Sequence, residues 1–247
     1  MKNVIVSLLI SMLIASTVAM MAMEGLASRG ENGKENQLEK IVFIHYKKDH
    51  AKPVDKSKQT KCYKLLPAKV SWKETPISYV INPQNPFNLD ESLILSAVSS
   101  AAEEWDAHTS RELMEDQYTI DYSVAAGIQD YRNVVAFGNY QEEGVIAITT
   151  IWYNPATKAI VEFDIMLDTD WVWGNADSNN DGIVDNPLVM DIQNIATHEF
   201  GHAIGLGDVY NYECSEVTMY GYSDYGEIKK RSLEQPDITA LQTLYGN

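Results

Sequence analysis

The chain has 247 residues, 45% of them hydrophobic, and a formal net charge of −16 at pH 7. This length and composition are typical of one globular domain with additional N-terminal material. So acidic a balance excludes proteins that hold nucleic acid on a basic surface, because the phosphate backbone repels acidic side chains. It suits a protein that stays soluble and binds cations.

The N-terminal segment has the features of a secretory signal peptide. Residues 1–27 begin with a lysine at position 2 and continue as an uncharged, apolar run to Met23 with small residues near its end. Cleavage after Ala19 or after Ala27 fits the small-residue rule equally well. Secretion is therefore expected. The alternative is an anchor that stays uncleaved, because an apolar run of roughly 20 residues also spans a bilayer.

Residues 28–63 are predicted to be a polar arm or a short pro-segment. The stretch is rich in lysine and asparagine and contains one short apolar patch at residues 41–46. Such a composition buries little apolar surface, which favours a flexible arm. A globular domain is expected to occupy residues 64–247.

Strand and helix patterns follow one another in this domain. The stretch 72–81 ends in strand-like alternation, and Asp90 is suited to cap a helix that runs to about His108. On one face of that helix recur Leu93, Ala97, Ala101 and Trp105. Strand-like runs follow at residues 119–126, 133–138, 145–153 and 159–167. A helix, several strands and a second helix predict an α+β layered fold.

A loop rich in aspartate and asparagine lies between the last strand and the second helix. Its sequence, DSNNDGIVD, has the ligand spacing of an EF-hand calcium loop, with Gly182 at the sharp turn. The predicted calcium ligands are Asp177, Asn179, Asp181, Asp185 and the backbone carbonyl of Ile183. Leu188 stands where an EF-hand has its bidentate glutamate, so Asp191 or another acidic side chain has to complete the shell. The alternative is an Asn/Asp/Gly turn without metal.

The stretch HEFGHAIGLGD predicts a zinc site. On a helix, residues four apart share a face, so His198 and His202 are able to bind one metal ion with Glu199 beside them. Gly205 is suited to end the helix and turn the chain back, which brings Asp208 within reach as a third ligand. Three protein ligands leave the fourth position of a tetrahedral zinc open, as in catalytic sites. Glu199 is then the predicted general base.

Cys62 and Cys214 are the only cysteines of the sequence. In an exported chain they are predicted to form a disulfide that ties the start of the domain to the loop beyond the metal ligands. The alternative is that the Cys62 thiolate binds the zinc in a latent precursor.

These motifs resemble those of the metzincin metallopeptidases, most closely the matrixin-like branch, over residues 64–247. The zinc motif has Asp208 where most members have a third histidine, as in the snapalysin-type enzymes. EVTMYGY resembles the Met-turn, so the resemblance places Met219 beneath the zinc and Tyr220 at the tyrosine that follows it. The ending RSLEQPDITALQTLYG, residues 231–246, is similar to the C-terminal helix of matrixins. The implied fold is α+β: a twisted mixed β-sheet with two long helices, the second carrying the zinc ligands, and a small C-terminal subdomain with the Met-turn and a final helix.

The resemblance implies a zinc endopeptidase that acts on proteins or peptides. With the predicted signal peptide the protein is expected to be secreted, and it is expected to be a monomer. The strand at 145–153 is expected to form the upper rim of the cleft and to pair with an extended substrate. The pocket wall is expected between Met219 and Arg231, where the basic run from Lys229 is interpreted as a solvated face; the alternative is that it selects acidic residues in the substrate. A cysteine-switch sequence and histidines for a second zinc are absent from the sequence, so neither feature is carried over.

Two other functions compete with this interpretation. One is a catalytically inactive, calcium-dependent secreted binding module on a peptidase fold, whose expected mark is a broken zinc motif. The other is a zinc hydrolase for something other than protein, such as a small amide. The sequence retains Glu199 and all the candidate zinc ligands, which favours the peptidase.

Overall fold

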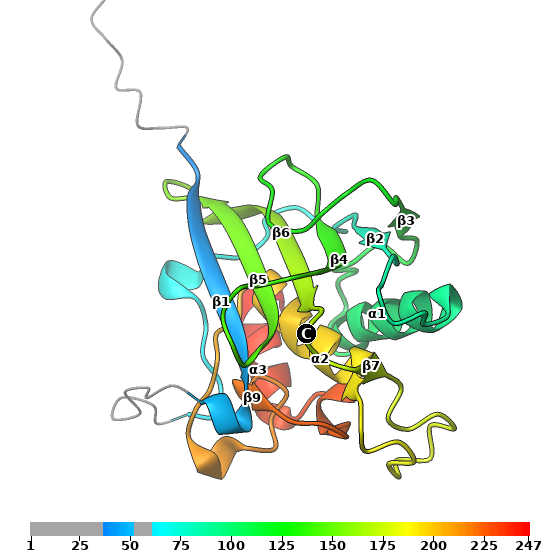
Figure 1. Cartoon of the computed structure of the whole chain (residues 1–247). Coiled ribbons are helices and arrows are strands. Elements are labelled where there is room, and N and C mark those ends of the chain that lie inside the picture. The colour runs from blue at the N-terminus through cyan, green and yellow to red at the C-terminus, as the bar shows by residue number, and fades with distance from the viewer. Residues whose placement is uncertain (1–36, 52–60) are drawn as a thin grey trace, which may run out of the picture. The chain divides into compact units, whose positions relative to one another are not determined.

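The computed structural model describes residues 37–51 and 61–247, so the predicted signal peptide and parts of the predicted arm lie outside the described residues. Within these ranges the fold consists of a seven-stranded sheet, a two-stranded sheet and three α-helices (Figure 1). In spatial order the strands of the large sheet are β3 (Thr119–Ile120), β2 (Val80–Asn82), β4 (Val134–Gly138), β6 (Ala159–Asp168), β5 (Val145–Asn154), β1 (Glu39–Lys47) and β9 (Tyr222–Ser223). The predicted α+β class is confirmed.

The large sheet is mixed. Strands β3, β2, β4 and β6 run parallel to one another, whereas β5 is antiparallel both to β6 and to β1. Strand β9 continues the sheet parallel to β1. The small sheet pairs β7 (Trp173–Gly174) with β8 (Met190–Asp191). Because β5 and β6 are consecutive antiparallel strands, a short turn is able to join them. Strand β5 lies between β6 and β1, at the opposite side of the sheet from β2 and β3.

The helices are α1 (Glu91–Asp106), α2 (Ile192–Ala203) and α3 (Gln235–Tyr245). Helix α2 packs against α1 and against strands β5 and β6, and Figure 1 shows α1 and α2 beside each other. The short 3₁₀ helices are η1 (Lys48–His50), η2 (Pro67–Lys69), η3 (Tyr212–Cys214) and η4 (Lys229–Arg231). Among the described residues, none of the helices has the length and apolarity that a bilayer crossing requires.

Helix α1 begins where the sequence predicts but buries a different face. The Asp90 side chain accepts a hydrogen bond from the backbone N–H of Ser92 and so caps the helix. The predicted face is wrong in part, because Leu93 and Ala97 are only partly buried. The residues buried in the core are Ile94, Val98, Ala101, Ala102 and Trp105. The stripe is displaced by one residue, since the apolar residues of this helix fill more than one face and only packing against α2 selects between them.

The segment at 39–47 differs from the polar arm that the composition predicts. It forms strand β1, whose residues from Glu39 to Tyr46 pair with β5. Within the apolar patch at 41–46, the side chains of Ile41, Phe43 and Ile44 are partly buried and pack against the hydrophobic core. The prediction of an arm is therefore wrong for this stretch, because pairing with a neighbouring strand stabilises a segment whose own composition does not. Whether residues 28–63 are removed as a pro-segment stays a prediction.

The strands predicted at 133–138, 145–153 and 159–167 are confirmed as β4, β5 and β6. The strand predicted at 119–126 ends early, after Ile120. There the Asp121 side chain accepts hydrogen bonds from the backbone N–H and hydroxyl of Ser123, which bends the chain into a turn. The carbonyl of Val124 then accepts from the Asn82 side chain instead of a strand backbone.

Candidate metal centre

Helix α2 holds two histidines on one buried face. Its N-terminus is capped by Asp191, whose side chain accepts from the backbone N–H of Asn194. His198 and His202 are 0% and 1% exposed, so the helix presents both rings to the protein interior. After the helix, Gly205 has a φ of +109°, a backbone conformation that favours glycine, and the chain turns back. The turn brings Asp208, which is 7% exposed, to the same place as the two rings.

The three side chains have the spacing of metal ligands. Oδ1 of Asp208 lies 3.3 Å from Nε2 of His198 and 3.3 Å from Nε2 of His202. In a tetrahedral zinc site with ligands about 2.0–2.1 Å from the ion, two ligand atoms lie about 3.3–3.4 Å apart. Within the described chain, Nε2 of His198 and Oδ1 of Asp208 are also buried polar atoms without a hydrogen-bond partner. Both observations fit a metal ion bound among these atoms.

The second nitrogen of each ring is held by a backbone carbonyl. Nδ1 of His198 lies 2.7 Å from the carbonyl oxygen of Thr218, and Nδ1 of His202 lies 3.0 Å from that of Leu206. A carbonyl oxygen only accepts, so each Nδ1 carries the proton and donates it. The free lone pair of each ring is then on Nε2, facing Asp208, which is the tautomer that a metal needs.

Burial and charge act in opposite directions on these groups. Burial lowers the pKa of His198 to about 4, so this ring is neutral at pH 7. Burial alone would raise the pKa of Asp208, but the facing rings of His202 and His198 outweigh it and hold the pKa well below its usual range. A neutral imidazole and an ionised carboxylate are the forms that bind a cation.

Glu199 lies beside this group with both carboxylate oxygens engaged. Its Oε2 accepts a hydrogen bond of 2.6 Å from the hydroxyl of Thr149 on β5, and its Oε1 is 2.9 Å from Nδ1 of His45 on β1. Glu199 is 0% exposed, and burial raises its pKa to about 7. A carboxylate whose pKa is near neutrality is suited to take and return a proton. No local sequence pattern identifies Thr149 or His45 as a partner of the Glu199 carboxylate.

The segment from Thr218 to Tyr220 packs against helix α2 and holds one of the candidate metal ligands. Met219 is 0% exposed and packs against Gly201 of α2. The buried carboxylate of Asp237, in the first turn of α3, accepts from the backbone N–H groups of Thr218 and Met219. Asp237 therefore fixes the carbonyl of Thr218 that holds the His198 ring. Tyr220 is 7% exposed and lies in the same turn.

Strand β1 lies across the two histidines. The ring of Phe43 stacks on that of His202, with ring centroids 3.9 Å apart and an interplanar angle of 6°. The ring of His45 is 4.0 Å from that of His198, and His45 is 1% exposed. The edge of β5 expected to receive an extended substrate is therefore paired with β1 in this structure. His45, His198 and Glu199 also bring ligand atoms within 4.8 Å of one another.

The basic run near the C-terminus is not a solvated face, contrary to the sequence interpretation. Lys230 is 0% exposed, and its Nζ donates to the carbonyls of Tyr220 and Tyr222 and to the hydroxyl of Ser223. Burial lowers its pKa to about 8. Of the three residues, Lys229 keeps the most exposed side chain, at 28%. The segment between Met219 and Arg231 thus has a buried cation that fastens it, because the ammonium of Lys230, near its end, donates to the carbonyls of Tyr220 and Tyr222, near its start.

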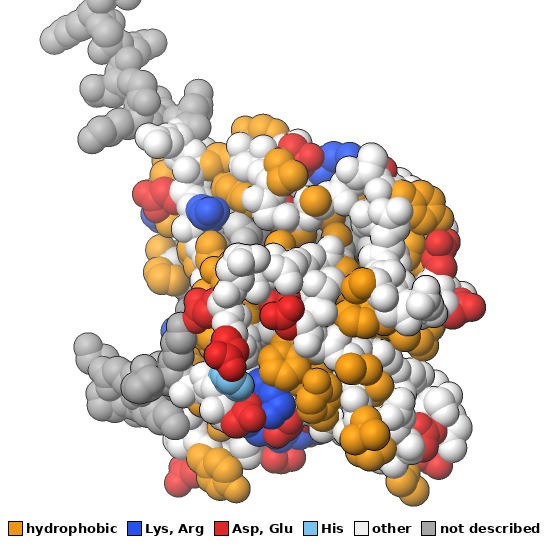
Figure 2. All heavy atoms as spheres, in the orientation of Figure 1, with side chains coloured by type: hydrophobic (Ala, Val, Ile, Leu, Met, Phe, Trp, Pro, Cys, Tyr) orange, Lys and Arg blue, Asp and Glu red, His pale blue; other side chains and the backbone are white. Residues whose placement is uncertain are grey.

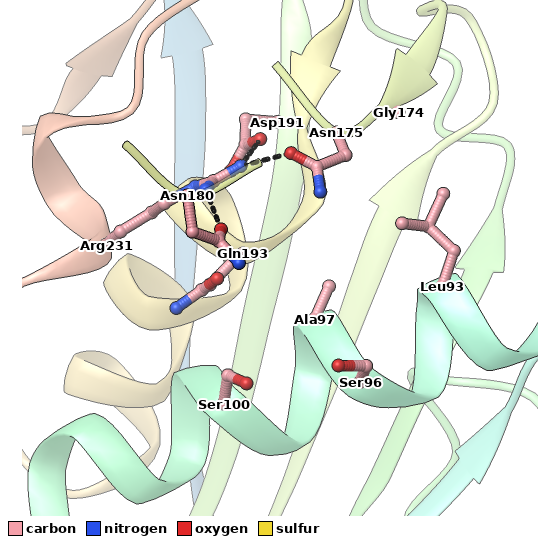
Figure 3. Close-up of a pocket in the computed structure, with 10 residues that line it drawn as sticks. All are labelled: Leu93, Ser96, Ala97, Ser100, Gly174, Asn175, Asn180, Asp191, Gln193 and Arg231. Atoms are coloured by element: carbon pink, nitrogen blue, oxygen red, sulfur yellow. Dashed lines mark hydrogen bonds and ion pairs between the residues drawn. The ribbon is translucent and has the colours of Figure 1, made fainter. Parts of the chain in front are cut away.

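Arg231 reaches the acidic loop in which calcium is predicted. Its guanidinium donates to the Asp191 carboxylate and to the side-chain oxygens of Asn175 and Asn180 (Figure 3). It lies 3.9 Å from Oδ2 of Asp177. The positive charge of Arg231 therefore partly balances this loop.

The predicted calcium ligands are mostly exposed and bound to the backbone of their own loop. Asp177 is buried and accepts from the N–H groups of Asp181 and Gly182, and Asp185 accepts from Ser178. Asn179 and Ile183 are exposed. Among the described residues, two groups of histidine or acidic side chains converge closely enough for a metal, and neither includes this loop.

Cys62 and Cys214 form a disulfide, which confirms the predicted pairing. The bridge joins residues separated by 152 positions and fastens the start of the domain to η3, just beyond Asp208. Cys62 is consequently not a free thiolate in this structure.

Comparisons with known proteins agree with the geometry of the site. The sequence profile described as Matrixin matches residues 71–246. Similar proteins include Metalloendoproteinase 2-MMP of Arabidopsis thaliana, 25% identical over 190 residues that cover 75% of this chain and 46% of that protein. Neutrophil collagenase of Homo sapiens is 24% identical over 81% of this chain and 40% of its own length. Stromelysin-1 of Mus musculus is 24% identical over 74% of this chain and 35% of its own length. The chain thus spans less than half the length of these relatives.

Proposed function

The chain belongs to the matrixin family, and from this premise we propose that it is a zinc-dependent endopeptidase. The observation that carries the proposal is the spacing of His198, His202 and Asp208, whose facing atoms lie 3.3 Å apart with Asp208 common to both pairs. That spacing suits tetrahedral zinc. Membership of the family supports zinc as the metal, and the third ligand, Asp208, is proposed from this chain alone.

Each residue of the site then has a separate task. His198, His202 and Asp208 hold the zinc, which supplies Lewis-acid activation of a water molecule and of the substrate carbonyl. Glu199 is the general base that takes the proton of the water and returns it to the leaving amine. Thr149 orients Glu199 through its hydrogen bond to Oε2, which leaves Oε1 as the oxygen that receives the proton.

The variant Glu199→Gln tests this division of tasks. It keeps the shape of the side chain and a hydrogen-bond acceptor but is not able to take a proton. We expect the same zinc content as in the wild type and a rate of casein or peptide cleavage about 10²- to 10⁴-fold lower. The pair is compared in the full chain and again with Ile44→Pro added, because β1 is paired with the edge of β5 that a substrate would use. Wild-type rates in the Gln variant would refute the mechanism and favour another base.

We propose that the substrates are proteins or peptides in extended conformation. The support is the antiparallel strand β5, whose Thr149 contacts Glu199 and whose edge is able to pair with a peptide backbone. A peptide library incubated with the wild-type chain and with Ile44→Pro identifies the side chains preferred at the cleavage site. Cleavage restricted to small amides would favour the other hydrolase function.

Export and calcium complete the proposal. The disulfide supports an oxidising compartment, and fractionation of producing cells tests secretion. The ligand spacing of residues 177–185 supports a structural calcium. An unfolding temperature that rises with added Ca²⁺, and does not rise in Asp181→Ala, is the expected result. Sedimentation tests the proposed monomer.

A further inference from the structure

Strand β1 is paired along both of its edges, with β5 on one side and with β9 on the other. These are the two segments expected to form the upper rim and the wall of the substrate cleft. On one side, β1 pairs antiparallel with β5, from Glu39 opposite Tyr153 to His45 opposite Ala147. On the other side, Tyr46 and Lys47 pair parallel with β9, which belongs to the segment after Met219. In Figure 1 the blue strand β1 lies beside β5, with β9 near its end. An extended peptide that adds to the edge of β5 would take this same place.

The side chains of β1 that point inward lie over the catalytic groups. Phe43 covers His202 and His45 covers His198, at the ring distances given above. Nδ1 of His45 is 2.9 Å from Oε1 of Glu199, the oxygen that Thr149 leaves open. With β1 in place, each carboxylate oxygen of Glu199 already has a protein partner, His45 at Oε1 and Thr149 at Oε2.

The opposite nitrogen of His45 faces the pocket wall. Nε2 of His45 lies 3.3 Å from Nζ of Lys230, the buried ammonium that holds Tyr220 and Tyr222 of the wall. Nε2 is able to accept from the ammonium while Nδ1 donates to Glu199. A single neutral ring thereby links the base of the active site to its wall.

From these contacts we infer that β1 is an intramolecular inhibitor that occupies the place of the substrate and engages Glu199 through His45, so that the full chain is latent. This inference rests on the proposed function. It does not involve a cysteine, because Cys62 is paired with Cys214.

The burial of β1 favours a docked segment over a core strand. Of its nine residues, His45 and Tyr46 are buried, and Val42 is 42% exposed. Burial is thus concentrated at the end that lies over the active site. The disulfide fastens the chain after β1, at Cys62, and leaves β1 held by noncovalent contacts and by its connection to the following residues. Strand β1 is therefore able to leave the cleft while the domain stays fastened.

The test compares the full chain with Ile44→Pro. Proline fixes φ, removes a backbone donor and is disfavoured inside a sheet, so it weakens the pairing of β1 with β5. If β1 is docked about 99% of the time, freeing the cleft raises the rate of cleavage of a fluorogenic peptide about 100-fold. Val42→Ala, a change in the same strand at an exposed side chain, is the matched control and should leave the rate unchanged. If the wild type and folded Ile44→Pro both cleave the peptide, and do so at equal rates, the inference is overturned.

A second variant and a binding measurement keep the test decisive. Phe43→Ala with His45→Ala removes the rings that pack on His202 and His198 and so weakens the docking of β1. It replaces Ile44→Pro if the proline variant does not fold. A labelled peptide with the sequence of residues 38–48 is then added to each chain, with Glu199→Gln present so that the probe is not cut. We expect the probe to bind the freed chain and not the wild-type cleft.

These outcomes separate the two proposals. If the probe binds the freed chain and not the wild type, occupation of the cleft by β1 is supported, even when no variant cleaves any peptide. In that case only the endopeptidase proposal fails. Equal binding of the probe to both chains would overturn the inference. Rapid cleavage by the wild type with no gain in either variant would also overturn it and leave the endopeptidase standing.

Discussion

Replacement of Gly201 by alanine tests whether the zinc helix and the Met-turn are packed as closely as the structure indicates. In an isolated helix this change stabilises by about 1 kcal/mol, because glycine is a poor helix former. Here an added methyl group would lie 2.8 Å from Cζ2 of Trp105 and 3.0 Å from Cε of Met219, with Sδ of Met219 closer still. Carbon atoms in favourable contact are about 3.5–4.0 Å apart. Because Trp105 and Met219 are both 0% exposed, neither moves without disturbing the core.

The balance of these effects gives the expected magnitude. Overpacking a core by one methyl group costs about 1–3 kcal/mol, and contact with two fully buried side chains suggests the upper part of that range. After the gain in helix propensity is subtracted, Gly201→Ala should destabilise by about 2 kcal/mol. Displacement of Met219 should also move the neighbouring carbonyl of Thr218 that holds His198, and thereby weaken zinc binding.

The assay is urea unfolding of the metal-free chain, because bound metal would add its own stabilisation. Zinc affinity is measured separately. Met219→Ala and the double variant complete a cycle: removal of the Met219 side chain should relieve the clash, so the double variant should be about 1–2 kcal/mol more stable than the sum of the single effects. Ser96→Ala, at an exposed position of α1, controls for a general effect of alanine in a helix. The reasoning would be refuted if the free energy of unfolding of Gly201→Ala rose by about 1 kcal/mol. It would also be refuted if the effects of Gly201→Ala and Met219→Ala added to that of the double variant within about 0.5 kcal/mol.

Three further predictions concern the third metal ligand, the disulfide and a buried carboxyl group. Asp208→Ala is expected to lose zinc on dialysis and Asp208→His to retain it; zinc retained by the alanine variant would exclude Asp208 as a ligand. Replacement of Cys62 and Cys214 by serine opens a loop of 152 residues and should lower the free energy of unfolding by about 2–5 kcal/mol; a loss below about 1 kcal/mol would contradict this estimate. Burial raises the pKa of Asp164 from 3.8 to about 7. Its contribution to stability is therefore complete below pH 3.8 and is lost as the pH rises through about 7. The melting temperature should fall across this range, and less steeply in Asp164→Asn; an unchanged slope in that variant would show that other groups are responsible.

The metal-binding residues on the helix are the part of the site that local sequence predicts best. Helical spacing alone places His198 and His202 on one face, and Gly205 supplies the backbone freedom for the turn that follows. The same reasoning finds the caps of α1 and α2, because capping depends on residues only a few positions apart. These predictions need no knowledge of the rest of the chain.

Contacts between distant segments are beyond such reasoning. The pairing of β1 with β5 joins residues about one hundred positions apart. The apolar patch at 41–46 is a short continuous run, whose pattern alone does not distinguish a strand from a helix. Lys230 lies between two other basic residues, so its sequence context indicates a solvated face. In the fold, its ammonium instead donates to the carbonyls of Tyr220 and Tyr222. A buried cation is recognised only when its partners are known.

The sequence by itself determined the residues of the proposed zinc site: two histidines, a glutamate and an aspartate on a helix and its turn, since their positions are governed by local backbone geometry. The tertiary structure decided what has access to that site. It brings Thr149 and His45 to opposite oxygens of Glu199 and seats Phe43 on His202, because strand pairing depends on long-range backbone hydrogen bonds and packing that no local pattern specifies.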